Sequence, residues 1–331
     1  MRPALLAVLI FLISGCAAMQ MGSPTVSILV DLDPASPDRT VIVESVTADQ
    51  QGRLYLADWV SGNILRVDPR APKPVVVGRI ENRQIAGKSV RGDGRGVAFN
   101  AQGDLFIACD PFSEIVRIKR ADINPDKPGI AETFATATEG ANGFAFDRQG
   151  NLYVAGARTG RVYRVGPGGG RAEVVLQIEP HNRILSDKKT QQPIVANGLA
   201  FDADGVLYIT DTARGAIWKT TIGVDGSAAK PTLLAQSPLL EGADGLDFDR
   251  SGRLWITANE RNAILTLTSD GKIQEIAKNG SQGPLEFPSA IVFVGNAAYV
   301  SNNDTPRGDN LDANGTTARD GIGASITQIT L

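Results

Sequence analysis

The stretch Asn197-Gly-Leu-Ala-Phe-Asp-Ala-Asp-Gly-Val-Leu-Tyr208 decides the fold, because its pattern recurs along the chain. It combines an apolar strand, an Asp-x-x-Gly turn and a second strand closed by an aromatic residue, which is the signature of a β-hairpin. Five further segments place an aromatic residue the same eleven positions after their first residue; they cover residues 44–55, 95–106, 142–153, 244–255 and 288–299. Six copies of one hairpin predict a repeat architecture.

Two more strand-like segments follow the hairpin in a complete copy, such as residues 62–68 and 74–77 in the first copy. A complete copy therefore supplies four strands, and successive copies begin 44 to 55 residues apart, as blades of a propeller do. The sequence predicts an all-β, six-bladed β-propeller with four-stranded blades. The last copy lacks an outer strand, so we expect residues 25–31 to supply it and to close the ring without a free edge.

The composition agrees with a single globular β domain. Hydrophobic residues make up 42% of the 331 residues, and 36 glycines indicate many tight turns. No linker-like stretch divides the repeats, so residues 25–331 are predicted to form one domain, expected to be a monomer. Lys and Arg number 33 and Asp and Glu number 36, and no run of like charge occurs. A nucleic-acid partner is therefore not expected.

The N-terminus carries the pattern of an export signal. Arg2 precedes an apolar run over residues 4–13, which is too short to span a membrane. The segment Ile13-Ser-Gly-Cys16 resembles the lipobox of bacterial lipoproteins. That resemblance implies a signal peptide at residues 1–15, lipidation of Cys16 and a short tether at residues 16–24. An ordinary signal peptide with a chance cysteine is the alternative.

If the lipobox interpretation holds, the chain is anchored in the bacterial cell envelope, and its only membrane contact is the N-terminal lipid. Ala17, where lipoproteins retained at the inner membrane often have Asp, favours the outer membrane, with the domain facing the periplasm. The remaining cysteine, Cys109, lies in an apolar strand and is expected to be a small core residue.

The first residues of the six copies are expected to form a ring at one mouth of the central channel, because the first strand of a propeller blade lines that channel. The ring consists of Glu44, Arg95, Asn142, Asn197, Asp244 and Pro288. Two carboxylates and two carboxamides offer hard oxygen ligands, which suit Ca²⁺ or another hard divalent ion.

The order of these residues resembles the gluconolactonase/regucalcin family, also known as senescence marker protein, whose six-bladed propellers hold one divalent metal. The resemblance implies metal ligation by Glu44, Asn197 and Asp244, the last two in Asn-Gly and Asp-Gly pairs. It also implies that Asn142 contacts the substrate or the water on the metal. Ca²⁺ is the expected ion, with Zn²⁺, Mg²⁺ and Mn²⁺ as alternatives. The resemblance covers roughly residues 41–301, and strictosidine-synthase-like, paraoxonase-like and NHL-repeat propellers share its short motifs.

By the same resemblance, the chain is expected to hydrolyse a small-molecule lactone or related ester. The metal would polarise the carbonyl group, a water would attack, and Asp244 would serve as catalytic general base. The chain has no Gly-x-Ser-x-Gly motif and only one histidine, His181, so a serine triad is excluded. The alternative is a non-catalytic, NHL-like envelope propeller that binds a ligand or a protein at the channel mouth.

Two features depart from the family pattern. Glu44 is followed by Ser45 and Val46, where the family usually has Gly-Pro or a similar pair. Arg95 opens the second copy, and two roles are open for it. It pairs with Glu44 or Asp244, in which case the ring needs no metal, or it binds a carboxylate or hydroxyl group of the substrate.

Other polar residues of the repeats invite structural interpretations. A turn-stabilising role is expected for the aspartates of the hairpin turns, which are Asp49, Asp147, Asp202 and Asp249. Asp58 and Asp211 follow second strands, where they either fasten the next turn or contact a ligand. His181 lies in a long segment between the third and fourth copies, residues 179–194. It is either a substrate contact or an exposed loop residue.

Overall fold

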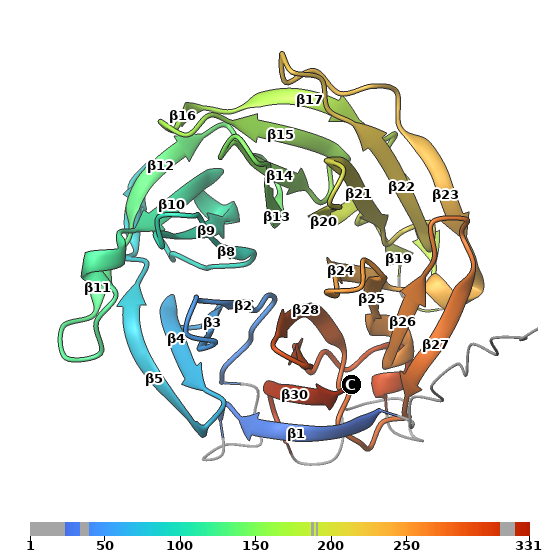
Figure 1. The fold of residues 1–331 in the computed structure, drawn as a ribbon. Helices are drawn as coiled ribbons and strands as arrows, with labels where there is room; N and C mark the ends of the chain where they lie inside the picture. Colours follow the sequence, from blue (N-terminus) through green and yellow to red (C-terminus); the bar gives the residue numbers. More distant parts are fainter. Residues whose placement is uncertain (1–23, 34–39, 187–188, 190, 312–321) are drawn as a thin grey trace, which may run out of the picture.

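The computed structural model describes residues 24–33, 40–186, 189, 191–311 and 322–331. Within these residues the secondary structure consists of β-strands and five short 3₁₀ helices, with no α-helix. Six antiparallel sheets stand in a ring around a central channel, as Figure 1 shows. The predicted six-bladed propeller is therefore confirmed.

The four main strands of each blade follow one another from the channel outwards. Blade one holds β2 (Thr47–Ala48), β3 (Leu54–Ala57), β4 (Asn63–Asp68) and β5 (Ala71–Arg79). Blade two holds β8 (Val97–Phe99), β9 (Leu105–Cys109), β10 (Glu114–Ile118) and β12 (Glu132–Thr136). Blade three holds β13 (Ala141–Phe146), β14 (Leu152–Gly156), β15 (Arg161–Val165) and β17 (Glu173–Gln177).

The second half of the ring repeats this order. Blade four holds β20 (Ala196–Phe201), β21 (Val206–Asp211), β22 (Ala216–Thr221) and β23 (Thr232–Gln236). Blade five holds β24 (Ala243–Phe248), β25 (Leu254–Ala258), β26 (Ala263–Leu267) and β27 (Ile273–Lys278). Blade six holds β28 (Pro288–Val294), β29 (Ala297–Asn302), β30 (Ser325–Thr330) and, outermost, β1 (Thr25–Asp31).

The first and the last strand of the described chain, β1 and β30, meet in blade six (Figure 1). Strand β1 pairs antiparallel with β30, and Thr25 lies opposite Thr330. The predicted closure by the N-terminal strand is confirmed. Two further short strands join neighbouring blades, because β11 (Gly129–Ile130) extends β5 and β16 (Gly170–Arg171) extends β12, both in parallel.

The segments that lead from one blade to the next carry the remaining elements. Two rim hairpins, β6 (Arg83–Ile85) with β7 (Lys88–Val90) and β18 (Arg183–Ile184) with β19 (Gln191–Gln192), lie in the long connections before blades two and four. The 3₁₀ helices are η1 (Asp110–Phe112), η2 (Arg120–Asp122), η3 (Pro238–Leu240), η4 (Asn259–Arg261) and η5 (Gly308–Asn310). Because each connection precedes an inner strand, the two hairpins lie on the side of the channel where Asn197 and its equivalents stand.

Aromatic pairs explain why the closing aromatic residue recurs in the repeats. The ring at the end of one hairpin packs edge-on against the phenylalanine in the inner strand of the next blade. Tyr55 contacts Phe99 with ring centroids 4.9 Å apart, and Tyr153 contacts Phe201 at 5.1 Å. The same contact joins Phe106 to Phe146, Tyr208 to Phe248 and Trp255 to Phe293. Each pair contributes about 0.5–1.5 kcal/mol beyond its area burial, so the repeat pattern stabilises the packing between blades.

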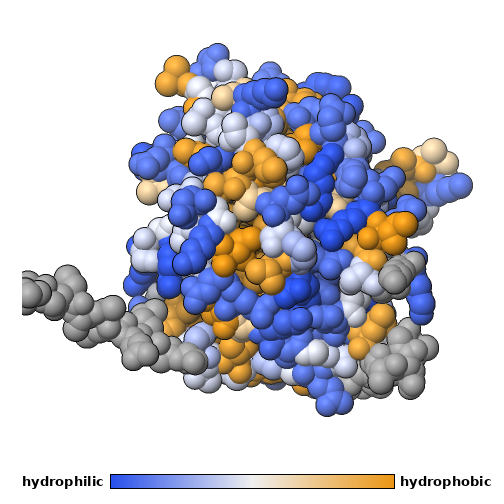
Figure 2. All heavy atoms as spheres, turned by 90° about the vertical axis from the view of Figure 1, so that its right-hand side faces the viewer, coloured by the Kyte–Doolittle hydropathy of each residue, from blue (hydrophilic) through white to orange (hydrophobic). Residues whose placement is uncertain are grey.

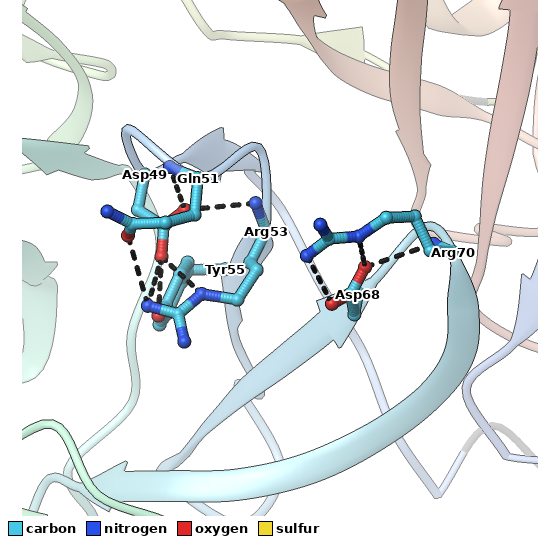
Figure 3. Close-up of polar contacts among 6 residues, drawn as sticks. All are labelled: Asp49, Gln51, Arg53, Tyr55, Asp68 and Arg70. Carbon is cyan, nitrogen blue, oxygen red and sulfur yellow. Dashed lines mark hydrogen bonds and ion pairs between the residues drawn. The ribbon is translucent and has the colours of Figure 1, made fainter.

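The hairpin aspartates stabilise their turns, as predicted. Asp49 accepts hydrogen bonds from the backbone N–H groups of Gln51 and Arg53 and, at 3.0 Å, from the Tyr55 hydroxyl group (Figure 3). Figure 3 also shows an ion pair of 2.7 Å between Arg70 and Asp68 at the turn that follows β4. These carboxylates are occupied by local contacts.

The glycine in the Asn-Gly and Asp-Gly pairs is required by the close approach of neighbouring inner strands. A Cβ atom on Gly143 would lie 2.3 Å from the Asn197 carbonyl oxygen, and one on Gly198 would lie 2.4 Å from the Asp244 carbonyl oxygen. The glycine in these motifs is therefore required for packing. The Asn or Asp of each pair is the residue whose side chain is available for binding or catalysis.

The surface is mixed in polarity. On the face drawn in Figure 2, hydrophobic side chains are interspersed with hydrophilic ones. No helix within the described residues is long and apolar enough to cross a membrane. The signal peptide, Cys16 and most of the tether lie outside the described residues, so lipidation and the cellular location stay predictions.

Candidate metal and active site

Four of the six predicted ring residues come together in the central channel. The channel has a volume of about 300 Å³ and is lined at one end by Glu44, Asn142, Asn197 and Asp244. The inner strands of all six blades line the rest of it. The two asparagines and Asp244 are each no more than 5% exposed, so this mouth places buried polar groups around the propeller axis.

A chain of hydrogen bonds joins the two asparagines. The Asn142 amide nitrogen Nδ2 donates to Asn197 Oδ1 at 2.6 Å. Asn197 Nδ2 in turn donates to the hydroxyl of Thr212 at 3.0 Å, and Thr212 donates to the Ala243 carbonyl oxygen at 2.6 Å. The network therefore runs from blade three through blade four to the backbone of blade five.

The Glu44 side chain is partly buried, and its carboxylate is held by amide donors from both sides. Asn303 Nδ2 donates to Glu44 Oε2 at 3.0 Å, and Asn142 also forms a side-chain hydrogen bond to this carboxylate. Burial raises the pKa of Glu44, although the positive charges of Arg95 and Arg307 and the two amides act against the shift. The protein groups around Glu44 therefore do not fully stabilise its charged form.

The Asp244 carboxylate is affected more strongly. Burial, followed by the negative charge of Glu44, holds the pKa of Asp244 well above its usual range. Asn259 Nδ2 donates to Asp244 Oδ2 at 2.9 Å and acts in the opposite direction. The charge of Glu44 disfavours the ionisation of the buried Asp244, and a cation bound between the two carboxyl groups would relieve this repulsion.

Contacts with blade six hold Glu44 in place, although Ser45 and Val46 stand where the family usually has Gly-Pro or a similar pair. The inner strand of blade one is only two residues long and starts three residues after Glu44. The Ser301 hydroxyl group donates to the Glu44 carbonyl oxygen at 3.4 Å, alongside the Asn303 contact to the carboxylate. The neighbouring blade therefore supplies the support that the short strand cannot give.

Arg95 does not form an ion pair with either ring carboxylate. Its guanidinium lies 3.6 Å from Asp110 and stacks over the Trp59 ring at 4.3 Å from the centroid. Of the two roles left open for Arg95, pairing with Glu44 or Asp244 is not the one observed, because Trp59 and Asp110 hold the guanidinium group. Its charge still lowers the pKa of Glu44, so Arg95 lies near enough to act at the channel mouth.

The residues that support the ring follow a second regular spacing, which sequence reasoning missed. Fifteen positions after the ring residue of blades two, four and five stand Asp110, Thr212 and Asn259, and each contacts its own ring residue. The equivalent residue of blade six, Asn303, contacts Glu44 of blade one. Aligning the copies beyond the closing aromatic residue would have shown this second set.

The donor set fits a hard divalent cation. Glu44 and Asn197 Oδ1 both accept from the same amide group of Asn142, so two oxygens from different blades converge on one electropositive group. Asp244 adds a third oxygen donor from the adjacent blade, and all three are ligand types that Ca²⁺ prefers. Among the described residues no group of three or more His, Cys, Asp or Glu side chains is placed to hold a metal ion.

The other predicted candidates have structural surroundings. Asp58 accepts from the backbone N–H groups of Ile42 and Val60. Asp211 accepts from the Trp218 indole nitrogen at 3.0 Å and pairs with Arg214. Both aspartates therefore fasten loops. His181 is exposed on the rim.

The fold and site together define a six-bladed β-propeller with a buried carboxylate and amide cluster at one mouth. Residues 174–301 match the family described as the SMP-30/Gluconolactonase/LRE-like region. Lactonase drp35 of Staphylococcus aureus strain MW2 is 27% identical over 192 residues, which are 57% of this chain and 54% of that protein. The chain thus spans about half the length of the curated relatives it matches. The resemblance to gluconolactonase-like propellers that was expected from the sequence is confirmed.

Solved structures show the same fold at low identity. The calcium-binding protein regucalcin of Agrobacterium tumefaciens superposes with a TM-score of 0.63 at 15% identity, covering 93% of this chain and 95% of that one. Virginiamycin B lyase of Staphylococcus aureus superposes with a TM-score of 0.59 at 14% identity, covering 93% and 99%. Because a lyase shares this architecture, the function has to be argued from the site.

Proposed function

We propose that the chain is a divalent-metal-dependent hydrolase of a lactone or related ester. The observation that carries the proposal is the pair of carboxyl groups formed by the partly buried Glu44 and the buried Asp244 at a mouth otherwise lined by amides; the charge of Glu44 adds to the raised pKa of Asp244. The match to lactonase drp35 supports the same class of reaction. The regucalcin likeness is at the level of the fold, and that protein's description as calcium-binding makes Ca²⁺ the first ion to test.

Glu44, Asn197 and Asp244 would hold the cation, which supplies a Lewis acid to polarise the substrate carbonyl. Asn259 occupies Asp244 Oδ2, so Oδ1 is the atom that accepts a proton from the attacking water. The water oxygen bonds to the carbonyl carbon, the ring C–O bond breaks, and Asp244 returns the proton to the leaving oxygen.

Substrate binding is assigned to Asn142 and Arg95. Asn142 stands between Glu44 and Asn197, which take the two N–H groups of its amide, so Oδ1 is the atom that would contact the substrate or the attacking water. Arg95 is anchored by Trp59 and Asp110 beside the mouth and would contact a hydroxyl or carboxylate group of the substrate. The alternative function, a non-catalytic and metal-free propeller, predicted an ion pair between Arg95 and Glu44 or Asp244. Arg95 pairs with Asp110 instead, so this ion pair does not support the alternative.

The proposal is tested by measuring hydrolysis of a panel of five- and six-membered lactones in the presence of Ca²⁺. We expect the Asp244→Ala variant to lose both cation binding and turnover. Asp247→Asn is the matched control, because Asp247 lies on the same inner strand and lines the channel but stands outside the mouth cluster. Lactone hydrolysis retained by Asp244→Ala contradicts the proposed function.

We also propose that the chain reaches the cell envelope through a lipid on Cys16. Membrane fractionation of cells that express the natural chain or Cys16→Ser tests this. The lipid anchor predicts that only the natural chain sediments with the membranes; equal sedimentation of both contradicts it.

A further inference from the structure

Thr212 contacts a proposed metal ligand through its side chain. It stands just after β21, fifteen positions after Asn197, and is 1% exposed. Its hydroxyl oxygen contacts two groups, the Asn197 amide and the Ala243 carbonyl oxygen. The residue therefore lies between a candidate ligand of blade four and the strand that carries Asp244.

The chemistry of a hydroxyl group fixes the direction of these contacts. A threonine hydroxyl has one proton, and a backbone carbonyl can only accept. The contact with Ala243 at 2.6 Å therefore uses the proton of Thr212. What faces the Thr212 lone pair has to be a donor, so the NH₂ group of Asn197 turns toward Thr212 and its Oδ1 turns away, toward Asn142.

This direction matters because only the oxygen of an asparagine side chain ligates a hard cation. If the amide of Asn197 rotated by half a turn, its NH₂ group would face the Asn142 amide and the site would lose a ligand. We propose that Thr212 is a positioning residue that fixes the Asn197 amide so that Oδ1 faces the cation site. The inference rests on the proposed function, because it assumes that a cation binds at this mouth.

A pair of substitutions at Thr212 isolates the hydroxyl group. Thr212→Val keeps the shape and removes the hydroxyl, whereas Thr212→Ser keeps the hydroxyl. Thr257→Val is a control of the same kind, since the buried Thr257 hydroxyl lies 3.2 Å from the Gly245 and Ser289 carbonyl oxygens, which are backbone groups of the inner strands. Both valine variants leave backbone carbonyls without a donor, so they should lower the melting temperature similarly.

The measurement is the dissociation constant of Ca²⁺ alone, by calorimetric titration of each metal-free protein, with the melting temperature alongside. We expect Thr212→Val to weaken Ca²⁺ binding by about 10- to 100-fold, while Thr212→Ser and Thr257→Val stay close to the natural chain. If Thr212→Val binds Ca²⁺ as tightly as the natural chain, or if Thr257→Val loses as much Ca²⁺ affinity as Thr212→Val, the positioning role of Thr212 is overturned. The proposed function is not affected by either result. If the natural chain binds no Ca²⁺, Mg²⁺, Mn²⁺ or Zn²⁺, the proposed function and this inference both fail.

Discussion

The Asn142 amide donates a hydrogen bond of 2.6 Å to Asn197 Oδ1, which joins blades three and four at the channel mouth. The same amide also reaches the Glu44 carboxylate. Asn142 thus occupies a place between two candidate ligands without being required as a ligand itself. Its loss should therefore separate catalysis from metal binding.

We predict that Asn142→Ala lowers kcat for lactone hydrolysis by about 100-fold, because the side chain proposed to orient the substrate or the attacking water is removed. The Ca²⁺ dissociation constant should change by less than about fivefold, since Glu44, Asn197 and Asp244 remain. Steady-state kinetics and calorimetric titration on the same preparation measure the two effects. Unchanged kcat, or loss of Ca²⁺ binding equal to that of Asp244→Ala, would assign Asn142 another role.

The glycine of the Asn-Gly pair can be tested separately from the asparagine. Gly198→Ala should destabilise the fold by about 3 kcal/mol, because the new Cβ would lie 2.4 Å from the Asp244 carbonyl oxygen. Gly166→Ala is the control, since a Cβ at this position would meet no atom within 4 Å and the change should stay within about 0.5 kcal/mol. Chemical denaturation measures both. Equal stability of the two variants would refute the packing argument.

Asp247 makes the free energy of unfolding depend on pH. Burial in the channel raises the pKa of Asp247 to about 7, whereas in the unfolded chain it titrates at about 3.9. The folded state therefore holds a proton that the unfolded state has lost, and stability falls as the pH rises from about 4 to about 7. Asp247→Asn removes this titration.

We expect Asp247→Asn to be more stable than the natural chain at pH 8 by about 2 kcal/mol, after screening by water in the channel, and equally stable below pH 4. The backbone N–H of Phe248, which donates to Asp247 Oδ1, keeps an acceptor in the variant. Melting temperatures of both proteins across this pH range measure the difference. A stability difference that does not vary with pH would show that Asp247 is not the titrating group.

The N-terminal strand should be essential to the closed ring. A chain that starts at residue 32 lacks β1 and exposes the edge of β30, so we expect the melting temperature to fall by on the order of 10 °C and the protein to self-associate. A chain that starts at residue 24 is the control, because it keeps the whole strand. Thermal melts with light scattering compare them, and matching curves would contradict the role of β1.

The fold was predictable from the sequence because each copy repeats the same local pattern. The closing aromatic residue, the turn aspartate and the second-position glycine each have a packing role that recurs, as in Tyr153, Asp49 and Gly198. The ring residues could be found for the opposite reason, since they differ at one aligned position. Glu44, Asn142, Asn197 and Asp244 do meet at one mouth, as predicted.

The surroundings of the ring were less predictable, because they depend on contacts between blades. The sequence left open whether Arg95 pairs with a ring carboxylate, and only the structure places it on Trp59 and Asp110. Arg307 acts on both ring carboxylates from a loop of blade six and forms an ion pair with Glu260, which no local motif indicates. Thr212 and Asn259 follow a regular spacing, but their partners are visible only in three dimensions.

The most direct test of a metal-dependent site is the metal content of the purified protein after dialysis against Ca²⁺ and removal of free ions. The proposed function predicts one bound Ca²⁺ per natural chain and none in Asp244→Ala, because a shared cation would relieve the repulsion between the carboxylates of Glu44 and Asp244. A natural chain without bound metal, or an Asp244→Ala variant that retains it, would contradict a metal site at this mouth.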